Sequence, residues 1–82
     1  MNLILYQTDF CQLCDEAAAL VYPVLEGNPA QLKLVDISLD DLLIEQYALL
    51  IPVLVVEGHP HLQLNWPFNR QDVRGLLARA SV

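Results

Sequence analysis

The sequence has few basic residues and no long apolar stretch, and each of these absences excludes a class of function. Four Lys and Arg residues stand against ten Asp and Glu residues, so the formal net charge is −6. Nucleic acids and anionic lipids require basic surfaces, and we expect neither as a partner. No apolar run approaches the ~20 residues of a membrane helix, and the first residues lack the basic segment of a secretory signal. We expect a soluble, cytoplasmic protein that does not bind membranes.

Cysteine is also scarce, because Cys11 and Cys14 are the only two in the chain. A structural zinc site usually gathers four Cys or His ligands, often as two such pairs, whereas here one pair stands alone. In a reducing cytosol a Cys pair is a candidate for catalysis or redox sensing rather than a structural staple. The pair therefore predicts redox chemistry at sulfur, with no metal.

Repeats and linkers are missing as well. The sequence has no low-complexity tract and no long Pro-, Gly- or Ser-rich segment. Apolar residues make up 55% of the 82 residues and charged residues 17%, which is typical of a packed globular chain and not of a disordered one. We therefore expect one domain over residues 1–82, and we take it to be a monomer.

The first half of the chain predicts two strand-to-helix steps. Residues 3–6 form a continuous apolar run, as in a buried central strand, and the Cys pair then opens a helix that stops near Gly27. Pro23 should kink or shorten this helix. Residues 32–37 predict a second strand, and Ser38 with Asp41 resembles a capping box for a short helix through Tyr47, which we expect in the core.

The second half predicts a hairpin and a last helix. Residues 52–56 form a strand, residues 58–60 turn the chain, and residues 61–64 form a shorter strand. Asn69 is the expected cap of the last helix, with Asp72 in its first turn. Its buried face comprises four apolar residues: Val73, Leu76, Leu77 and Ala80. Right-handed crossovers make the first two strands parallel, and the hairpin adds an antiparallel pair.

Two motifs carry a resemblance to a known family. The string Cys11–Ala17, Cys-Gln-Leu-Cys-Asp-Glu-Ala, and the step Ile51-Pro52-Val53 are similar to the glutaredoxin and thioredoxin superfamily, most closely to small bacterial glutaredoxin-like proteins. The expected fold is α/β and thioredoxin-like, βαβαββα, with a four-stranded mixed sheet flanked by three helices. The resemblance implies a cis proline at Pro52 that faces the thiols. We expect the substrate-binding residues to be Phe10, Gln12, Leu13, Ile51 and Pro52.

The chemistry requires a thiolate, and the N-terminus of a helix lowers the pKa of a thiol by stabilising that anion. Cys11 is therefore the expected nucleophile, and Cys14, one turn further into the helix, is the expected resolving cysteine. Asp9, Asp15 and Glu16 place negative charge around the same helix start and oppose the thiolate.

The chain departs from the pattern of dithiol glutaredoxins in ways that weaken a role for glutathione. Gln12 and Leu13 stand where those proteins usually have a proline and an aromatic residue, and the uncharged Thr8 stands where they have a basic one. Residues 65–68, Asn-Trp-Pro-Phe, occupy the region in which glutaredoxins bind the γ-glutamyl end of glutathione. A protein with a basic face suits such a site better than an anionic tripeptide.

Our leading hypothesis is a thiol-disulfide oxidoreductase that acts on protein disulfides or on mixed disulfides with glutathione, a candidate co-substrate, and that has no cofactor in the chain. The alternative is a catalytically weak module that binds a protein partner through a groove near Pro52. An iron-sulfur cluster held by Cys11 and glutathione across a dimer ranks last. His59 and His61 are interpreted as a solvated hairpin tip, and Arg70 and Arg74 as a solvated helix face.

Overall fold

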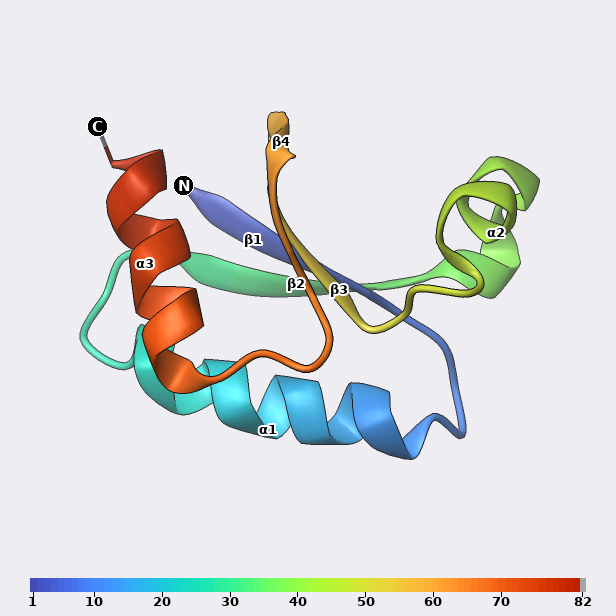
Figure 1. Ribbon diagram of the computed structural model, residues 1–82, viewed down its shortest axis with the longest axis horizontal. Helices are drawn as coiled ribbons and strands as arrows, with labels where there is room; N and C mark the ends of the chain where they lie inside the picture. Colours follow the sequence, from blue (N-terminus) through green and yellow to red (C-terminus); the bar gives the residue numbers. More distant parts are fainter. Residues whose placement is uncertain (82) are drawn as a thin grey trace.

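A computed structural model describes residues 1–81, in which four strands and three α-helices follow one another in the expected order (Figure 1). A short 3₁₀ helix, η1, stands before the second α-helix. The elements are β1 (Asn2–Gln7), α1 (Gln12–Leu25), β2 (Gln31–Asp36), η1 (Ile37–Leu39), α2 (Asp41–Tyr47), β3 (Val53–Val56), β4 (His59–Asn65) and α3 (Arg70–Ala80).

The four strands form one mixed sheet in the order β2-β1-β3-β4. β1 pairs in parallel with β2, so that Leu5 lies opposite Leu34, and antiparallel with β3, so that Leu5 also lies opposite Leu54. β3 and β4 form the antiparallel hairpin. The apolar run at residues 3–6 is therefore a central strand, and the predicted α/β class, element order and mixed sheet are confirmed.

The main core lies between the sheet and the helices α1 and α3, which cover the same face (Figure 1). Alternation along β1 directs Leu3 and Leu5 toward the helices, where both are fully buried. The predicted inner face of α3 is confirmed: Val73, Leu76 and Leu77 are buried, and Ala80 is half-buried against the same core. Burying a side chain of this size stabilises a fold by about 1.5–3 kcal/mol, so we expect this cluster of twelve buried residues to contribute more to stability than the smaller one on the other face.

The other face of the sheet carries a smaller core beneath α2. Tyr47 of α2 is buried, as predicted, and its ring stacks on Tyr6 of β1 with centroids 4.3 Å apart and planes 15° from parallel. Burial, and then the neighbouring Tyr6, raise the pKa of the Tyr47 hydroxyl. Ile37, Val53 and Val55 complete this cluster.

The expected capping box at Ser38 and Asp41 is wrong. The Asp36 carboxylate accepts the Ser38 N–H at 2.9 Å and caps η1, into which Ile37 also falls instead of β2. The Asp40 carboxylate accepts the Leu42 N–H at 2.8 Å and caps α2. Each aspartate lies two residues before a free backbone N–H at a helix start. A short carboxylate accepts from such an N–H directly, so no capping box between Ser38 and Asp41 is needed.

The hairpin is tighter than expected. β4 begins at His59, so Glu57 and Gly58 alone form the turn, and Gly58 takes the positive φ of 85° that such turns require. Pro60 lies in β4, which is an edge strand, where a missing N–H is tolerated. α1 continues through Pro23 and ends two residues later, at Leu25, so the proline lies in its last turn.

Candidate active site

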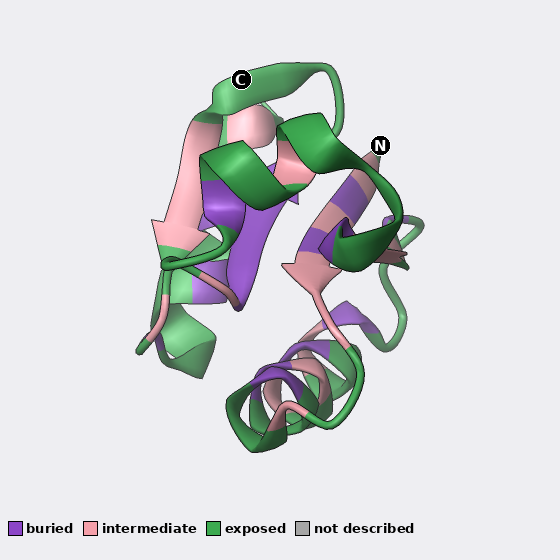
Figure 2. Ribbon diagram, turned by 90° about the vertical axis from the view of Figure 1, so that its right-hand side faces the viewer, coloured by how far each residue is buried: buried purple, intermediate pink, exposed green. Residues whose placement is uncertain are grey.

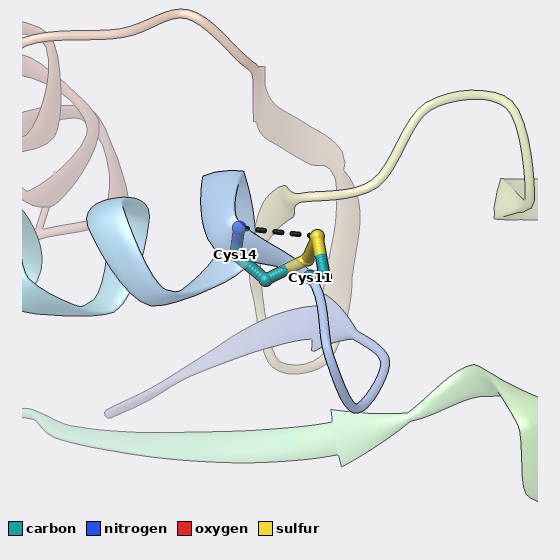
Figure 3. The surroundings of a disulfide bond; sticks show 2 residues. All are labelled: Cys11 and Cys14. Atoms are coloured by element: carbon teal, nitrogen blue, oxygen red, sulfur yellow. Dashed lines mark hydrogen bonds between the residues drawn. A yellow bond between two sulfur atoms is a disulfide. The ribbon is translucent and has the colours of Figure 1, made fainter.

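Cys11 sits at the N-terminus of α1, where it serves as the helix cap. Its backbone is extended, at φ −111° and ψ 103°, and its Sγ atom accepts the backbone N–H of Cys14 at 3.2 Å (Figure 3). The N–H of Asp15 bonds to the Cys11 carbonyl at 3.1 Å and starts the helical ladder. The sulfur thus occupies the place that an Asp or Ser oxygen takes at other helix starts, where donors and the helix dipole stabilise an anion.

A disulfide joins Cys11 to Cys14, whose Cα atoms are 5.2 Å apart. The two sulfur-bearing residues differ in exposure: Cys14 is 2% exposed, whereas Cys11 is only partly buried. A molecule that approaches from solvent therefore meets Cys11 first. This asymmetry matches the roles expected for the pair, although the roles themselves stay predictions.

Phe10, immediately before Cys11, is the most unusual residue of the site. Its φ is +57°, a left-handed conformation that bulky side chains rarely adopt, and its side chain is fully exposed. The fold therefore gains no packing from Phe10 to offset the strain. Gln12 and Leu13, on the other side of Cys11, are exposed as well. These three predicted substrate-binding residues are all accessible next to the disulfide.

Ile51 and Pro52 lie differently. The peptide bond between them is cis, as the resemblance implies. Val53, the next residue, pairs with Tyr6, so Pro52 lies beside the end of β1, from which the chain leads to Cys11. Pro52 is buried and Ile51 packs against the core beneath α2. Any contact of these two residues with a substrate would be made by the backbone more than by the side chains.

The charge around the cysteines is negative. Asp9, Asp15 and Glu16 are exposed, and no Lys or Arg occurs in the first 32 residues. Arg70 and Arg74 do not compensate, because α3 lies against the C-terminal half of α1 and the cysteines open that helix at its other end (Figure 1). Asp36 adds a further charge near the end of β1, where it pairs with Gln7, and hydrogen bonds from the Ser38 hydroxyl and backbone lower its pKa.

The segment that leads into α3, residues 65–69, makes contacts mainly within itself and with the first turn of that helix. Trp66 and Phe68 pack edge to face with centroids 5.1 Å apart, and the Trp66–Pro67 bond is a second cis peptide. Asn69 and Asp72 form a reciprocal capping box, with bonds of 2.8 and 2.9 Å between each side chain and the other's backbone N–H. The predicted cap is confirmed, and the carboxylate of Asp72 already satisfies part of the positive end of α3.

Within residues 1–81, no three or more His, Cys, Asp or Glu side chains lie close enough together to hold a metal ion. His59 and His61 are exposed, as expected, and lie edge to face at 5.9 Å, but they belong to β4 and not to the turn. In the same residues no helix is long and apolar enough to cross a membrane.

Two features of this end of the molecule escaped the sequence patterns. The left-handed conformation of Phe10 has no local signal, because such positions usually hold Gly or Asn. The exposed leucines of α2 and its flanking turns were also missed, since a short apolar-rich segment predicts burial. A test for helical periodicity would have helped here, because Leu43 and Tyr47, four residues apart, are the residues of α2 that pack into the core against the sheet.

Comparisons with known proteins give the family and the fold. The family model of the glutaredoxin-like domain (DUF836) matches residues 2–78. Among solved structures, the structural-genomics target XcR50 from X. campestris is 32% identical, with a TM-score of 0.75 over 94% of this chain and 96% of that one. Curated protein sequences give no match.

Two more distant structures share the fold alone. Thioredoxin 1 from Thermosipho africanus TCF52B is 12% identical, with a TM-score of 0.72 over 98% of this chain and 93% of that chain. A malarial protein is 15% identical, with a TM-score of 0.69 over 99% and 97%. Because the family model spans nearly all of the chain, this protein, with its thioredoxin-like fold and its Cys11–Cys14 disulfide, belongs to the glutaredoxin-like domain family (DUF836).

Proposed function

We propose that the protein is a thiol-disulfide oxidoreductase that cycles Cys11 and Cys14 between dithiol and disulfide. The observation that carries the proposal is the position of the pair: a reachable sulfur at the N-terminus of α1, bonded to a buried one three residues on. In the reduced protein, the Cys14 N–H that now reaches Cys11 Sγ at 3.2 Å would stabilise a Cys11 thiolate. The exposed acids oppose that effect, so the balance of the two sets the reactivity.

The reaction takes two steps and transfers two electrons. The Cys11 thiolate attacks one sulfur of a substrate disulfide, forming a mixed disulfide and releasing the first substrate thiolate. The Cys14 thiolate then attacks Cys11 Sγ, which forms the internal disulfide and releases the second substrate thiolate. The dithiol is oxidised and the substrate reduced. An external thiol reductant, either a dithiol or two molecules of glutathione, restores the starting state.

The charges favour a protein substrate over a glutathione mixed disulfide. Glutathione carries two carboxylates and one ammonium group, and the exposed side chains beside the disulfide offer Asp9, Asp15 and Glu16 without a Lys or Arg. The capping box of Asn69 and Asp72 also occupies the backbone N–H groups of both residues, which a carboxylate of glutathione would otherwise be able to bind at the start of α3. Glutathione remains in the proposal as a reductant that reacts through its thiol.

The test is a trapping experiment with two matched variants. Cys14→Ser keeps the expected nucleophile and removes the resolving sulfur, so a substrate disulfide should leave a stable adduct on Cys11 that mass spectrometry detects. Cys11→Ser keeps an oxygen acceptor at the helix cap and should fold normally, but it should form no such adduct and should have no reductase activity. Equal trapping by both variants would contradict the assigned roles.

The alternative, a binding module without catalysis, predicts another outcome for the same proteins. Thiols that stay unmodified across a series of reduced-to-oxidised glutathione ratios, in wild type and both variants, would favour it. A disulfide that forms near the cytosolic poise of roughly −220 to −320 mV would favour the oxidoreductase.

A further inference from the structure

The outer side of α2 and its flanking turns exposes apolar residues that the fold does not use. Leu39, Leu42 and Leu49 are 85%, 74% and 98% exposed, and Leu50 is 44% exposed. α2 is held to the sheet through Leu43 and Tyr47 instead. Apolar groups gathered on the surface of a small soluble domain usually mark a site of interaction. These four leucines are called the α2 patch below.

The α2 patch lies at the same end of the molecule as the disulfide. β1 ends at Gln7, which pairs with Asp36 just before η1, and Tyr6 stacks on Tyr47 of α2. Figure 1 places α2 and the start of α1 at one end of the sheet, and Figure 2, which looks onto that end, shows the exposed outer side of α2 above α1. A macromolecule that presents a disulfide to Cys11 would therefore also extend over α2.

Negative charge surrounds both parts of this end. Seven of the ten acidic residues occur in two short segments, 9–16 and 36–45, which flank the disulfide and the α2 patch: Asp9, Asp15, Glu16, Asp36, Asp40, Asp41 and Glu45. Lys33 is the only Lys or Arg among the first 69 residues, and it is bound to Glu57 at 2.8 Å. A partner that covers the leucines must also lie against these carboxylates.

We propose that the α2 patch is a docking surface for a protein substrate whose own apolar patch has a rim of Lys and Arg. The proposal rests on the proposed oxidoreductase function and names the kind of protein on which it acts. Apolar contact supplies affinity, and opposite charge speeds association and selects the partner. A second copy placed face to face would bring seven acids against seven, and an anionic membrane would be repelled in the same way.

The binding test uses two synthetic helical peptides that contain no cysteine and share the same apolar face. They differ only in the residues around that face, which are lysine in one peptide and glutamate in the other. Fluorescence anisotropy at low salt should give the lysine peptide an affinity at least about tenfold higher, and added salt should shrink the difference. The double variant Leu42→Ser, Leu49→Ser should bind the lysine peptide about tenfold more weakly than wild type does. Tyr22→Ser, which changes a half-exposed apolar residue of α1 outside the patch, should not.

The turnover test uses versions of the two peptides to which a pair of cysteines, closed as a disulfide, has been added. It also uses hydroxyethyl disulfide, which is small and uncharged. The double leucine variant should lose about tenfold in kcat/KM on the lysine peptide and retain its rate on hydroxyethyl disulfide. Because the substituted leucines are exposed, circular dichroism should show an unchanged fold, which separates docking from stability.

The outcomes separate the two proposals. A protein that reduces hydroxyethyl disulfide but binds both peptides equally overturns the docking surface and leaves the oxidoreductase intact. A protein that reduces no disulfide and still selects the lysine peptide overturns the oxidoreductase and supports the docking surface. Sedimentation that shows dimers in wild type and monomers in the double variant would assign the patch to a second copy and overturn the proposal.

Discussion

The two faces of the sheet are covered unequally. On one face α1 and α3 enclose a cluster of twelve buried residues, and on the other α2 covers four. The first face has two helices of 14 and 11 residues, whereas α2 has seven. A helix of two turns has little stability of its own, so α2 depends on its contacts with the sheet. The large face therefore maintains the fold, and the small face holds a segment whose outer leucines are free for other contacts.

The Cys11–Cys14 disulfide lies at the boundary between these two faces. Cys14 lies on the inner side of α1 and is buried, while Cys11 and Phe10 lie in the loop that connects β1 to that helix. Pro52 joins α2 to β3 and is also buried. A long, well-packed helix fixes one wall of the site, and the connection to the shorter helix forms the other. The long, well-packed helix carries the buried sulfur of Cys14, which suits the proposed thiol-disulfide reaction.

The largest effect should come from the large face. Leu54 of β3 is fully buried there, and Leu54→Ala should lower the free energy of unfolding by about 2–5 kcal/mol, because it removes buried methyl groups and leaves a cavity. Leu49→Ala is the matched control: it makes the same chemical change at a side chain that is 98% exposed, and it should cost less than about 0.5 kcal/mol. Urea denaturation followed by circular dichroism measures both variants. Similar losses of stability would contradict the conclusion that the larger core, and not the outer side of α2, maintains the fold.

A smaller effect is expected beneath α2. Tyr47→Leu keeps an apolar side chain but removes the stacked contact with Tyr6, and it should cost about 0.5–1.5 kcal/mol beyond the change in buried area. Tyr22→Leu is the control, because Tyr22 is half exposed and lies on α1. The same urea titration serves both variants. A loss as large as that of Leu54→Ala would mean that the small face contributes as much to stability as the large one.

The features that the sequence predicted well are those with a short-range or repeated signal. The apolar run at residues 3–6 predicted a central strand, and Asn69 with Asp72 predicted the cap of α3, because both patterns determine structure within a few residues. The cis bond before Pro52 came from the resemblance instead, since most X-Pro bonds are trans. The Cys pair at the start of α1 belongs to both kinds, as the spacing suggested a helix start and the family motif supported it.

The features that were missed depend on competition between neighbours. Asp36 and Asp40 displaced the expected cap at Ser38, and three candidates within five residues cannot be ranked from spacing alone. The hairpin turn lies at Glu57–Gly58 and not at the predicted residues 58–60, because Val56 pairs with His59 and draws His59 and Pro60 into β4. The exposure of the α2 leucines depends on which side of this short helix faces the sheet, and only the assembled fold specifies that side.

The smallest effect is expected at alkaline pH, where the hydroxyl of Tyr47, in the core beneath α2, ionises. Burial raises the pKa of Tyr47 above the ordinary value of 10.0, with Tyr6 adding to the shift. The folded state therefore holds this proton more tightly than the unfolded chain does. The stability that results is fully present below about pH 10 and is lost as the pH rises through the folded-state pKa, because stability falls where the folded state binds more protons.

Tyr47→Phe should remove this alkaline loss while it keeps the aromatic stack. At neutral pH the substitution should change stability little, because the 3.3 Å hydrogen bond from Gln46 Nε2 to the Tyr47 hydroxyl that it removes lies near the surface. Thermal unfolding of both proteins from pH 8 to pH 11 would show wild type falling more steeply than the variant above pH 10. Parallel curves would mean that the Tyr47 hydroxyl ionises as readily in the folded protein as in the unfolded chain. In that case neither burial nor the neighbouring Tyr6 would disfavour the ionised hydroxyl, even though the Tyr47 ring is buried beneath α2.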